Sequence, residues 1–236
     1  MKIHTFYYII LIALCATVAS CKKDNYDEPT STLKGRIVYQ GEAIGVERDQ
    51  VPYELYQYGF GKVGPIAASI AQDGTFSAVL FDGDYKFIIP NGQGPFMWKQ
   101  TASGAPDSLA ITIRGTQTLD VDVTPYYMIR TPNFTPSTAD SMAAATFKVE
   151  KIITDANAKD IEKVSLYVNK TQFVSGADNI AIKDMVGTDI TDPNNISLTV
   201  KVPPIVPKQN YVFARIGLKI AGVEDMIFSP VQKIQF

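Results

Sequence analysis

Carboxylates are the side chains of this sequence that come closest to a catalytic or metal-binding pattern. Asp82 and Asp84 flank a glycine, and Asp120 and Asp122 are predicted to share the polar face of one strand. Calcium takes about six to eight oxygen ligands, and a glycosidase needs two carboxylates about 5–10 Å apart across a cleft. Two carboxylates at positions i and i+2 supply only part of either site. We therefore interpret both pairs as turn or solvent-exposed residues and predict no metal, no cofactor and no enzyme activity.

The first 20 residues have the pattern of a secretory signal. Lys2 precedes an uncharged apolar run over residues 6–16, and Val18, Ala19 and Ser20 come directly before Cys21. The run is too short to cross a bilayer, which takes about 20 apolar residues. The pattern resembles the bacterial lipobox, in which the cysteine is acylated, becomes residue one and is acylated again. This resemblance implies a stable lipid anchor on Cys21. The alternative is an ordinary signal peptide with a chance cysteine.

Removal of residues 1–20 would leave little catalytic chemistry. That segment holds His4, the only histidine, and Cys15, one of two cysteines. Without it the chain has no Ser-His-Asp or Cys-His catalysis, no zinc site of cysteine or histidine and no internal disulfide. This inventory is typical of binding and structural modules.

The charge balance excludes one class of partner and suggests a location. The sequence has 22 Lys and Arg against 24 Asp and Glu, and its one basic cluster is Lys22-Lys23. We therefore predict no nucleic-acid partner. The lysine pair with the acidic residues after it resembles the signals that send lipoproteins of the Bacteroidetes to the outer face of the outer membrane. A solvated tether is the alternative. Residues 21–31 are predicted to be a flexible tether that reaches about 35 Å.

Residues 32–124 are predicted to form a first β-sandwich. Their apolar residues alternate with period two, and the turn signals Asp73-Gly74 and Asp82-Gly83-Asp84 separate successive runs. About six or seven strands fit between Leu33 and Val123, which suits one small sandwich. The alternating residues are Ile37, Tyr39, Val51, Tyr53, Leu55, Phe76, Ala78, Leu80, Tyr85, Phe87, Ile89, Leu119, Val121 and Val123.

The spacing in this first domain is similar to that of carboxypeptidase-regulatory-like domains. In that family a DG-x-F turn leads into a strand that ends near L-x-x-G-x-Y. Here Asp73-Gly74-Thr75-Phe76 and Leu80 to Tyr85 follow the same order. The resemblance implies a prealbumin-like sandwich.

Residues 125–236 are predicted to form a second β-sandwich. Three prolines lie between residues 124 and 136, and because proline disfavours helix interiors and central strands, we place the domain junction there. The segment from Asn210 to Gly217, followed by Gly222 and a Phe228-Ser229-Pro230 stretch, resembles the closing strands of an immunoglobulin or fibronectin type III sandwich. This resemblance implies a stabilising role for Tyr211 at a corner of the fold. The predicted fold class is all-β, with two tandem β-sandwich domains.

The whole chain resembles a family of two-domain lipoproteins from Bacteroidetes. The resemblance rests on the lipobox, the tether and the two sandwich patterns. Members are associated with outer-membrane nutrient-uptake systems of the starch-utilisation type, which pair a TonB-dependent transporter with surface glycan-binding lipoproteins. It implies an outer-membrane, cell-surface location and a transporter complex as partner. The family has no established catalytic residues to carry over.

Five aromatic residues are the candidate ligand contacts. Tyr56 and Tyr58 alternate with the inward set and point outward, Phe60 follows in a loop, and Phe96 and Trp98 follow a Gly-rich turn. Aromatic faces pack on sugar rings, so we predict that these residues contact a glycan. The alternative is that the rings pack in the core or at the domain junction.

Two serines fit a modification pattern. Asp107-Ser108-Leu109 and Asp140-Ser141-Met142 resemble the sequon for O-glycosylation of exported Bacteroidetes proteins. The alternative for Ser108 and Ser141 is an ordinary turn or cap. The sequence as a whole favours a lipid-anchored glycan-binding or complex-docking protein, with a structural or adhesive subunit as the rival interpretation.

Overall fold

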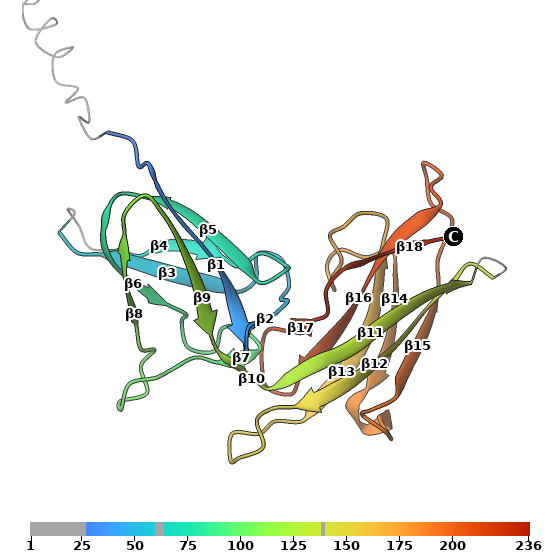
Figure 1. The fold of residues 1–236 in the computed structure, drawn as a ribbon. Coiled ribbons are helices and arrows are strands. Elements are labelled where there is room, and N and C mark those ends of the chain that lie inside the picture. Colours follow the sequence, from blue (N-terminus) through green and yellow to red (C-terminus); the bar gives the residue numbers. More distant parts are fainter. Residues whose placement is uncertain (1–26, 60–63, 138–139) are drawn as a thin grey trace, which may run out of the picture.

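A computed structural model of the chain describes residues 27–59, 64–137 and 140–236. Their strands form two β-sandwiches in tandem, and the one helical element among them is the short 3-10 turn η1 (Gly187–Asp189) (Figure 1). The all-β prediction is confirmed. The predicted signal, the predicted lipidation site Cys21 and the predicted ligand contact Phe60 lie outside the described residues. No described helix is long and apolar enough to cross a membrane.

The first sheet of the N-terminal domain is centred on β1. This strand pairs antiparallel with β5 on one side and parallel with β9 on the other, and the short β2 pairs with its end. The second sheet is antiparallel throughout, in the order β4-β3-β6-β8. The strands are β1 (Ser31–Tyr39), β2 (Glu42–Ala43), β3 (Pro52–Gln57), β4 (Ile66–Ser69), β5 (Thr75–Leu80), β6 (Gly83–Ile88), β8 (Leu109–Ile113) and β9 (Thr116–Asp122).

Period-two alternation produces the core between these two sheets. Tyr53, Phe76 and Phe87 point inward from three strands, and their ring centroids lie 5.1–5.3 Å apart. Burial raises the pKa of Tyr53 to about 12. The tilted and offset ring contacts are the arrangements that aromatic quadrupoles favour, so the alternation identified from sequence corresponds to a packed aromatic core.

The two turn signals of this domain carry the chain from one sheet to the other. Asp73-Gly74 joins β4 to β5, and the turn at Asp82 joins β5 to β6; in both cases the two strands belong to different sheets. Gly74 has φ +82°, which glycine adopts without strain. Ser31 donates a hydrogen bond to Asp82 and is buried, so it belongs to β1 and not to the predicted tether.

The C-terminal domain packs a three-stranded sheet against a five-stranded one. The first has the order β11-β12-β15; in the second, β16 pairs with β13, β17 and β18, and β14 pairs with β13. Buried aliphatic side chains from both sheets form the core. The strands are β11 (Tyr127–Ser137), β12 (Met142–Lys151), β13 (Ile161–Asn169), β14 (Ala181–Val186), β15 (Ile196–Lys201), β16 (Tyr211–Ile220), β17 (Ile227–Phe228) and β18 (Gln232–Gln235).

Most of the proline-rich segment is the edge strand β11, which begins directly after the predicted domain junction. Pro132 and Pro136 are tolerated there because β11 pairs with β12 alone, so its other edge needs no backbone donors. The register shifts between Arg130 and Asn133, and Thr131 has φ +47° at this bulge. Proline content alone therefore does not exclude an edge strand.

Tyr211 opens β16, as predicted, and is half-buried. Its ring packs edge-on against Phe213 at 5.7 Å, and Lys233 Nζ lies 3.9 Å from its centroid. These contacts fit a stabilising role through ring packing; the described residues provide no hydrogen bond to its hydroxyl of the kind found at the immunoglobulin corner.

A buried arginine joins the two domains. Arg215 on β16 is 1% exposed and donates hydrogen bonds to the carbonyl oxygens of Ser229 (2.7 Å), Val46 (3.1 Å) and Gln72, the last two from the N-terminal domain. Its guanidinium carbon lies 4.4 Å from the centroid of the Phe228 ring. Burial lowers the pKa of Arg215 to about 9, with Glu47 and Asp73 opposing the shift, so the side chain is cationic at neutral pH.

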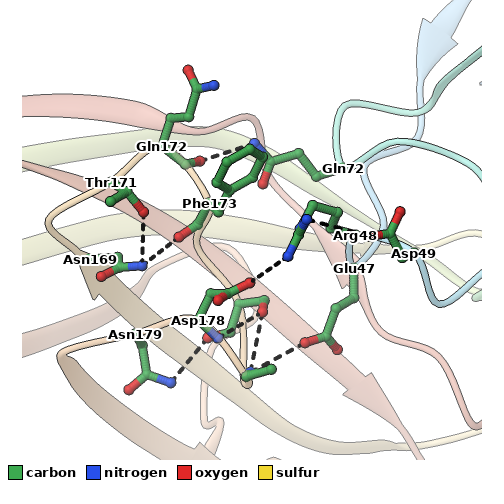
Figure 2. A network of polar contacts seen from close by, with 12 residues as sticks. Glu47, Arg48, Asp49, Gln72, Asn169, Thr171, Gln172, Phe173, Asp178 and Asn179 are labelled. Atoms are coloured by element: carbon green, nitrogen blue, oxygen red, sulfur yellow. Dashed lines mark hydrogen bonds and ion pairs between the residues drawn. The ribbon is translucent and has the colours of Figure 1, made fainter.

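A polar network extends this contact to the surface (Figure 2). Arg48 lies 3.7 Å from Asp178 and 4.7 Å from the centroid of the Phe173 ring. Glu47 accepts a hydrogen bond from the backbone N–H of Ala177 at 3.3 Å. We call Arg215, its carbonyl partners and this network the seam. The seam fixes how the two domains meet, and it therefore determines the form of the surface between them.

Candidate functional site at the domain junction

A groove of about 480 Å³ lies where both domains and their connection meet. The N-terminal domain contributes the loop before and around β7 (Phe96–Met97), which pairs with β10 (Thr124–Pro125). Tyr126 follows β10, and two loops of the C-terminal domain complete the walls. The lining residues are Pro90, Asn91, Gly92, Gln93, Gly94, Phe96, Met97, Trp98, Gln100, Tyr126, Asn157, Lys159, Gly222, Val223 and Glu224.

A second groove of about 550 Å³ adjoins the first. The two share Met97, Trp98, Gln100 and Asn157, so they form adjacent parts of one depression. The second part adds Asp122, Thr154 and Asp155 to the polar lining. We call the two together the junction groove. Strands β7 and β10, which contribute residues to it, lie toward the lower end of the N-terminal domain in Figure 1.

Tyr126 is the aromatic side chain of the groove that is half-buried instead of fully buried. Burial raises the pKa of its phenol. Lys159 Nζ lies 5.7 Å from the ring centroid and donates a hydrogen bond of 2.9 Å to the carbonyl of Gly222. Because an ammonium group has three donors, Lys159 keeps capacity for a ligand while the bond to Gly222 holds it above the ring.

Amide side chains also line the groove. Asn91 donates to the carbonyl of Gly104 at 2.8 Å and accepts from Gln100 at 3.2 Å. These bonds fix the orientation of Asn91 and leave further donor and acceptor capacity on Gln100. Asn157 lines both parts of the groove, its backbone N–H donates to Asp155 at 2.8 Å, and its side-chain amide makes no hydrogen bond among the described residues. The groove thus presents one aromatic face among fixed hydrogen-bonding groups.

A buried carboxylate holds the groove's loop against the C-terminal domain. Asp225 accepts a hydrogen bond of 2.7 Å from the backbone N–H of Gly94. Burial raises the pKa of Asp225, and the bond from Gly94 partly opposes that shift. Gly94 has φ +81°, and a Cβ atom there would lie 2.3 Å from the Phe96 ring, so this position requires glycine.

Phe96 and Trp98, two of the predicted glycan contacts, are core residues. They are 4% and 8% exposed. Trp98 donates from Nε1 to the carbonyl of Asp107 at 2.7 Å, and its ring lies 6.1 Å from that of Phe87. The turn before them is polar, but the sheet face behind it is apolar and takes up both rings. They form the floor of the junction groove and do not offer an open stacking face.

Tyr56 lies on the outer face of the second N-terminal sheet, and Tyr58 follows in the turn after β3; both point outward, as the predicted register requires. Tyr58 is 62% exposed, and Lys86 Nζ lies 5.4 Å from its ring centroid. Tyr56 is half-buried and donates to Glu54 at 2.8 Å. These residues line no part of the junction groove, so the structure separates the five predicted aromatic contacts into two regions, with Phe60 outside the described residues.

Three of the four paired carboxylates make structural contacts, and the fourth, Asp122, lines the second part of the junction groove. Asp120 pairs with Arg36, which lowers the pKa of Asp120, and Asp84 accepts a hydrogen bond from Thr112 at 2.6 Å. Asp82 accepts from Ser31, and this bond lowers the pKa of Asp82. Within residues 27–59, 64–137 and 140–236, no group of three or more carboxylate, histidine or cysteine side chains could hold a metal ion.

The two candidate modified serines lie outside strands. Ser108 is half-buried, and its backbone N–H donates to the Asp107 side chain at 2.8 Å. Ser141 is exposed, with φ +54°, in the turn before β12. Their glycosylation stays a prediction.

The fold and the junction define a class of two-domain, all-β proteins, and the comparisons identify the family. Residues 31–124 match the model described as "Protein of unknown function (DUF3823) N-terminal domain", and residues 127–233 match "Domain of unknown function (DUF3823_C)". The chain belongs to the two-domain DUF3823 family. No protein of curated function matches it.

Solved structures agree with this assignment. A DUF3823 family protein from Parabacteroides merdae is 31% identical with a TM-score of 0.76, covering 89% of this chain and 100% of its own. One from Bacteroides ovatus is 28% identical with a TM-score of 0.74, covering 87% of this chain and 98% of its own. A "putative carbohydrate binding protein" from Bacteroides uniformis is 16% identical with a TM-score of 0.66, covering 89% and 100%, and shares the fold.

Sequence reasoning missed the residues that complete the groove. Tyr126, Asn157, Lys159 and Glu224 come from three separate segments, and their meeting depends on how the domains pack. One signal was present in the sequence: Tyr126 follows directly on the Thr124-Pro125 step at the predicted junction, and domain junctions are frequent ligand sites.

Proposed function

We propose that this protein binds a glycan in the junction groove and has no enzyme activity. It would act as a lipid-anchored accessory protein of an outer-membrane nutrient-uptake system, displayed at the cell surface. The observation that carries the proposal is the groove itself, in which the half-buried Tyr126 lies among the polar side chains of both domains. Aromatic faces take the C–H side of sugar rings, while amide, ammonium and carboxylate groups bond their hydroxyls.

The composition of the groove favours a neutral, hydroxyl-rich ligand. Lys159 and Glu224 bring opposite charges, and the other polar side chains of the first part are the amides of Asn91, Gln93, Gln100 and Asn157. The second part adds Lys99, Asp122 and Asp155, so the junction groove holds charges of both signs and no cluster of a single sign. The similar Bacteroides uniformis protein is named a putative carbohydrate binding protein, which also supports a glycan ligand.

A glycan panel on soluble protein tests the proposal. The chain from residue 22 onward is assayed by calorimetry, followed by Tyr126→Ala and Asn157→Ala. We expect each variant to lose about tenfold or more in affinity, which corresponds to about 1.4 kcal/mol. Tyr58→Ala is the matched control, because Tyr58 is an exposed tyrosine on the outer sheet face. Loss of binding in the control with full binding in Tyr126→Ala would place the site on that face instead.

The anchor and location need separate measurements. Mass spectrometry of the native protein should find Cys21 as an acylated first residue. Protease treatment of intact cells should remove the protein if it faces the medium. A bare Cys21, or an uncut leader, would contradict the anchor without bearing on glycan binding.

Docking to a transporter complex is a second candidate, supported by β14. Ile182 and Val186 are large aliphatic side chains on this strand that are 44% and 50% exposed. Exposed apolar side chains mark protein interfaces. If docking is the function, Ile182→Asp with Val186→Asp should abolish the capture of outer-membrane partners such as a TonB-dependent transporter. Retained capture in this double variant, together with no glycan affinity in the native chain, would leave a structural or adhesive role.

A further inference from the structure

The far end of the C-terminal domain presents an exposed apolar loop, residues 203–209, which we call the tip loop. It joins β15 to β16. Its Val206 is 83% exposed, more than any other large hydrophobic side chain in the described part of the chain. An apolar groove of about 490 Å³ lies against the loop, lined by Ser141, Lys201, Val202, Pro203, Pro204, Ile205, Lys208, Gln209, Tyr211, Val212 and Phe236. Apolar surface therefore continues from the apex of the loop into the groove.

Lysines surround this apolar surface. Lys201 and Lys208 line the groove, and Lys233 lies over the Tyr211 ring at 3.9 Å. Lys170 is close by, because its carbonyl accepts a hydrogen bond from Gln209 at 3.0 Å. None of the four forms an ion pair with a carboxylate among the described residues. The end of the domain thus combines an exposed aliphatic apex with unpaired positive charge.

The tip loop and the start of the fold lie on the same side of the molecule. In Figure 1 the chain enters β1 at the upper end of the N-terminal domain, and the loop between β15 and β16 stands at the upper end of the C-terminal domain. Strands β7 and β10, which border the junction groove, lie toward the opposite end in the same view.

We propose that the tip loop is a second membrane contact, at which Val206 enters the interfacial layer of a bilayer and the surrounding lysines bind anionic headgroups. Apolar insertion and attraction to anionic lipid add together in interfacial binding. The orientation relies on the proposed lipid anchor, but the contact itself does not. With both ends against the membrane, the junction groove faces away from it and stays open to ligand.

A single-cysteine fluorescence experiment tests this contact. The chain from residue 22 onward contains no natural cysteine, so Val206→Cys gives one site for an environment-sensitive dye. Vesicles of phosphatidylcholine with phosphatidylglycerol are compared with vesicles of phosphatidylcholine alone. Val186→Cys is the matched control, because Val186 is an exposed valine that pairs with Lys163, near the other end of β13. Lys201→Glu with Lys208→Glu in the Val206→Cys background tests the charges.

We expect a blue shift of the dye at Val206 on anionic vesicles, no shift at Val186, and about tenfold weaker binding in the lysine double variant. No shift at Val206, or equal shifts at both positions, would overturn the proposal. Affinity of the tip loop for an outer-membrane protein without affinity for vesicles would also overturn it. Glycan affinity is measured on the same labelled protein, so failure of the membrane contact and failure of the glycan site are distinguished.

Discussion

The seam and the junction groove lie side by side at the same domain boundary but are built in opposite ways. At the centre of the seam, the buried Arg215 donates to three carbonyl oxygens and packs against the Phe228 ring. In the groove, Lys159 makes one bond to Gly222, Asn91 bonds to Gly104 and Gln100, and both side chains keep further hydrogen-bonding capacity. Arg215 uses its donors on carbonyl groups of the protein itself. The side chains of the groove are held in place and keep donors and acceptors for a ligand.

This difference indicates that the seam contributes stability at the domain boundary and the groove contributes binding. A ligand site shared between two domains loses affinity if the domains must first be ordered, because binding then carries that entropic cost. The seam removes the cost by fixing the domains beforehand. We therefore expect seam variants to change stability and groove variants to change binding.

The largest effect is expected from Arg215→Met. The substitution removes a buried cation and leaves three carbonyl groups without their donor, so the free energy of unfolding should fall by about 3–5 kcal/mol. Guanidinium-induced unfolding at neutral pH measures it. Arg48→Met is the matched control in the same seam, because its ion pair with Asp178 is exposed, and we expect a change below about 1 kcal/mol. Equal effects would mean that burial does not distinguish the two arginines.

Gly45→Ala should separate the domains by steric clash. The bridge between Gly45 and Phe228 is so close that a Cβ atom would lie 2.6 Å from the Phe228 carbonyl oxygen and 2.7 Å from Arg215 Nη2. Both neighbours are fixed, so we expect a loss of about 2–3 kcal/mol. Gly64→Ala, which meets nothing within 4 Å, is the control. An unchanged unfolding midpoint in Gly45→Ala would show that the domains can shift apart freely.

Asp225→Ala should loosen the loop at the edge of the groove. Its loss leaves the Gly94 N–H without an acceptor, which costs about 1–3 kcal/mol. Because this loop carries part of the groove, glycan affinity should fall together with stability. A variant that loses stability and keeps full affinity would show that the loop contributes no binding surface.

Asp225→Asn tests the buried carboxyl of Asp225 through the pH dependence of stability. The folded pKa of Asp225 is raised above the ordinary value of 3.8 by burial. The folded state therefore holds the proton more tightly, and the stability that this proton contributes is lost as pH rises through the folded pKa. As pH rises from 3.8 to the folded pKa, the native chain should lose stability that the Asp225→Asn variant, which has no titrating carboxyl at this position, does not lose. Identical profiles would contradict the raised pKa.

The smallest effect on stability is expected from Lys159→Ala. Its single bond to Gly222 lies at the surface, so the unfolding free energy should change by less than about 1 kcal/mol. Glycan affinity should nevertheless fall, because the ammonium group faces the Tyr126 ring. A loss of stability comparable to that of the Asp225 variant would assign Lys159 to the seam instead.

Local alternation was enough to predict the strands but not the seam. Tyr53 and Phe87 are buried as the period-two pattern required. Arg215 lies within a predicted strand, where an arginine is normally assigned to the solvent face. It is buried because the N-terminal domain covers that face, and its partner Val46 is 169 residues away. No local pattern encodes a contact over that separation.

The site was predicted less well for the same physical reason. Trp98 follows a polar, Gly-rich turn, which suggested exposure, but the apolar sheet behind it takes up the ring. Asn157 is a polar loop residue without any motif, and it becomes part of a groove only because its loop meets the segment around Met97. For the candidate site, the period-two register alone was enough to predict that Tyr58 points outward.

The position of β1 has a mechanical consequence. Any pull on the amino-terminal attachment enters the fold through this strand, which is bonded along both edges, from Ser31 to Arg36 with β5 and from Thr32 to Val38 with β9. A force along the strand axis strains both ladders at once, in shear, and cannot unzip them one bond at a time. A force transmitted by a bound glycan would therefore be opposed by all the backbone hydrogen bonds of both ladders at once.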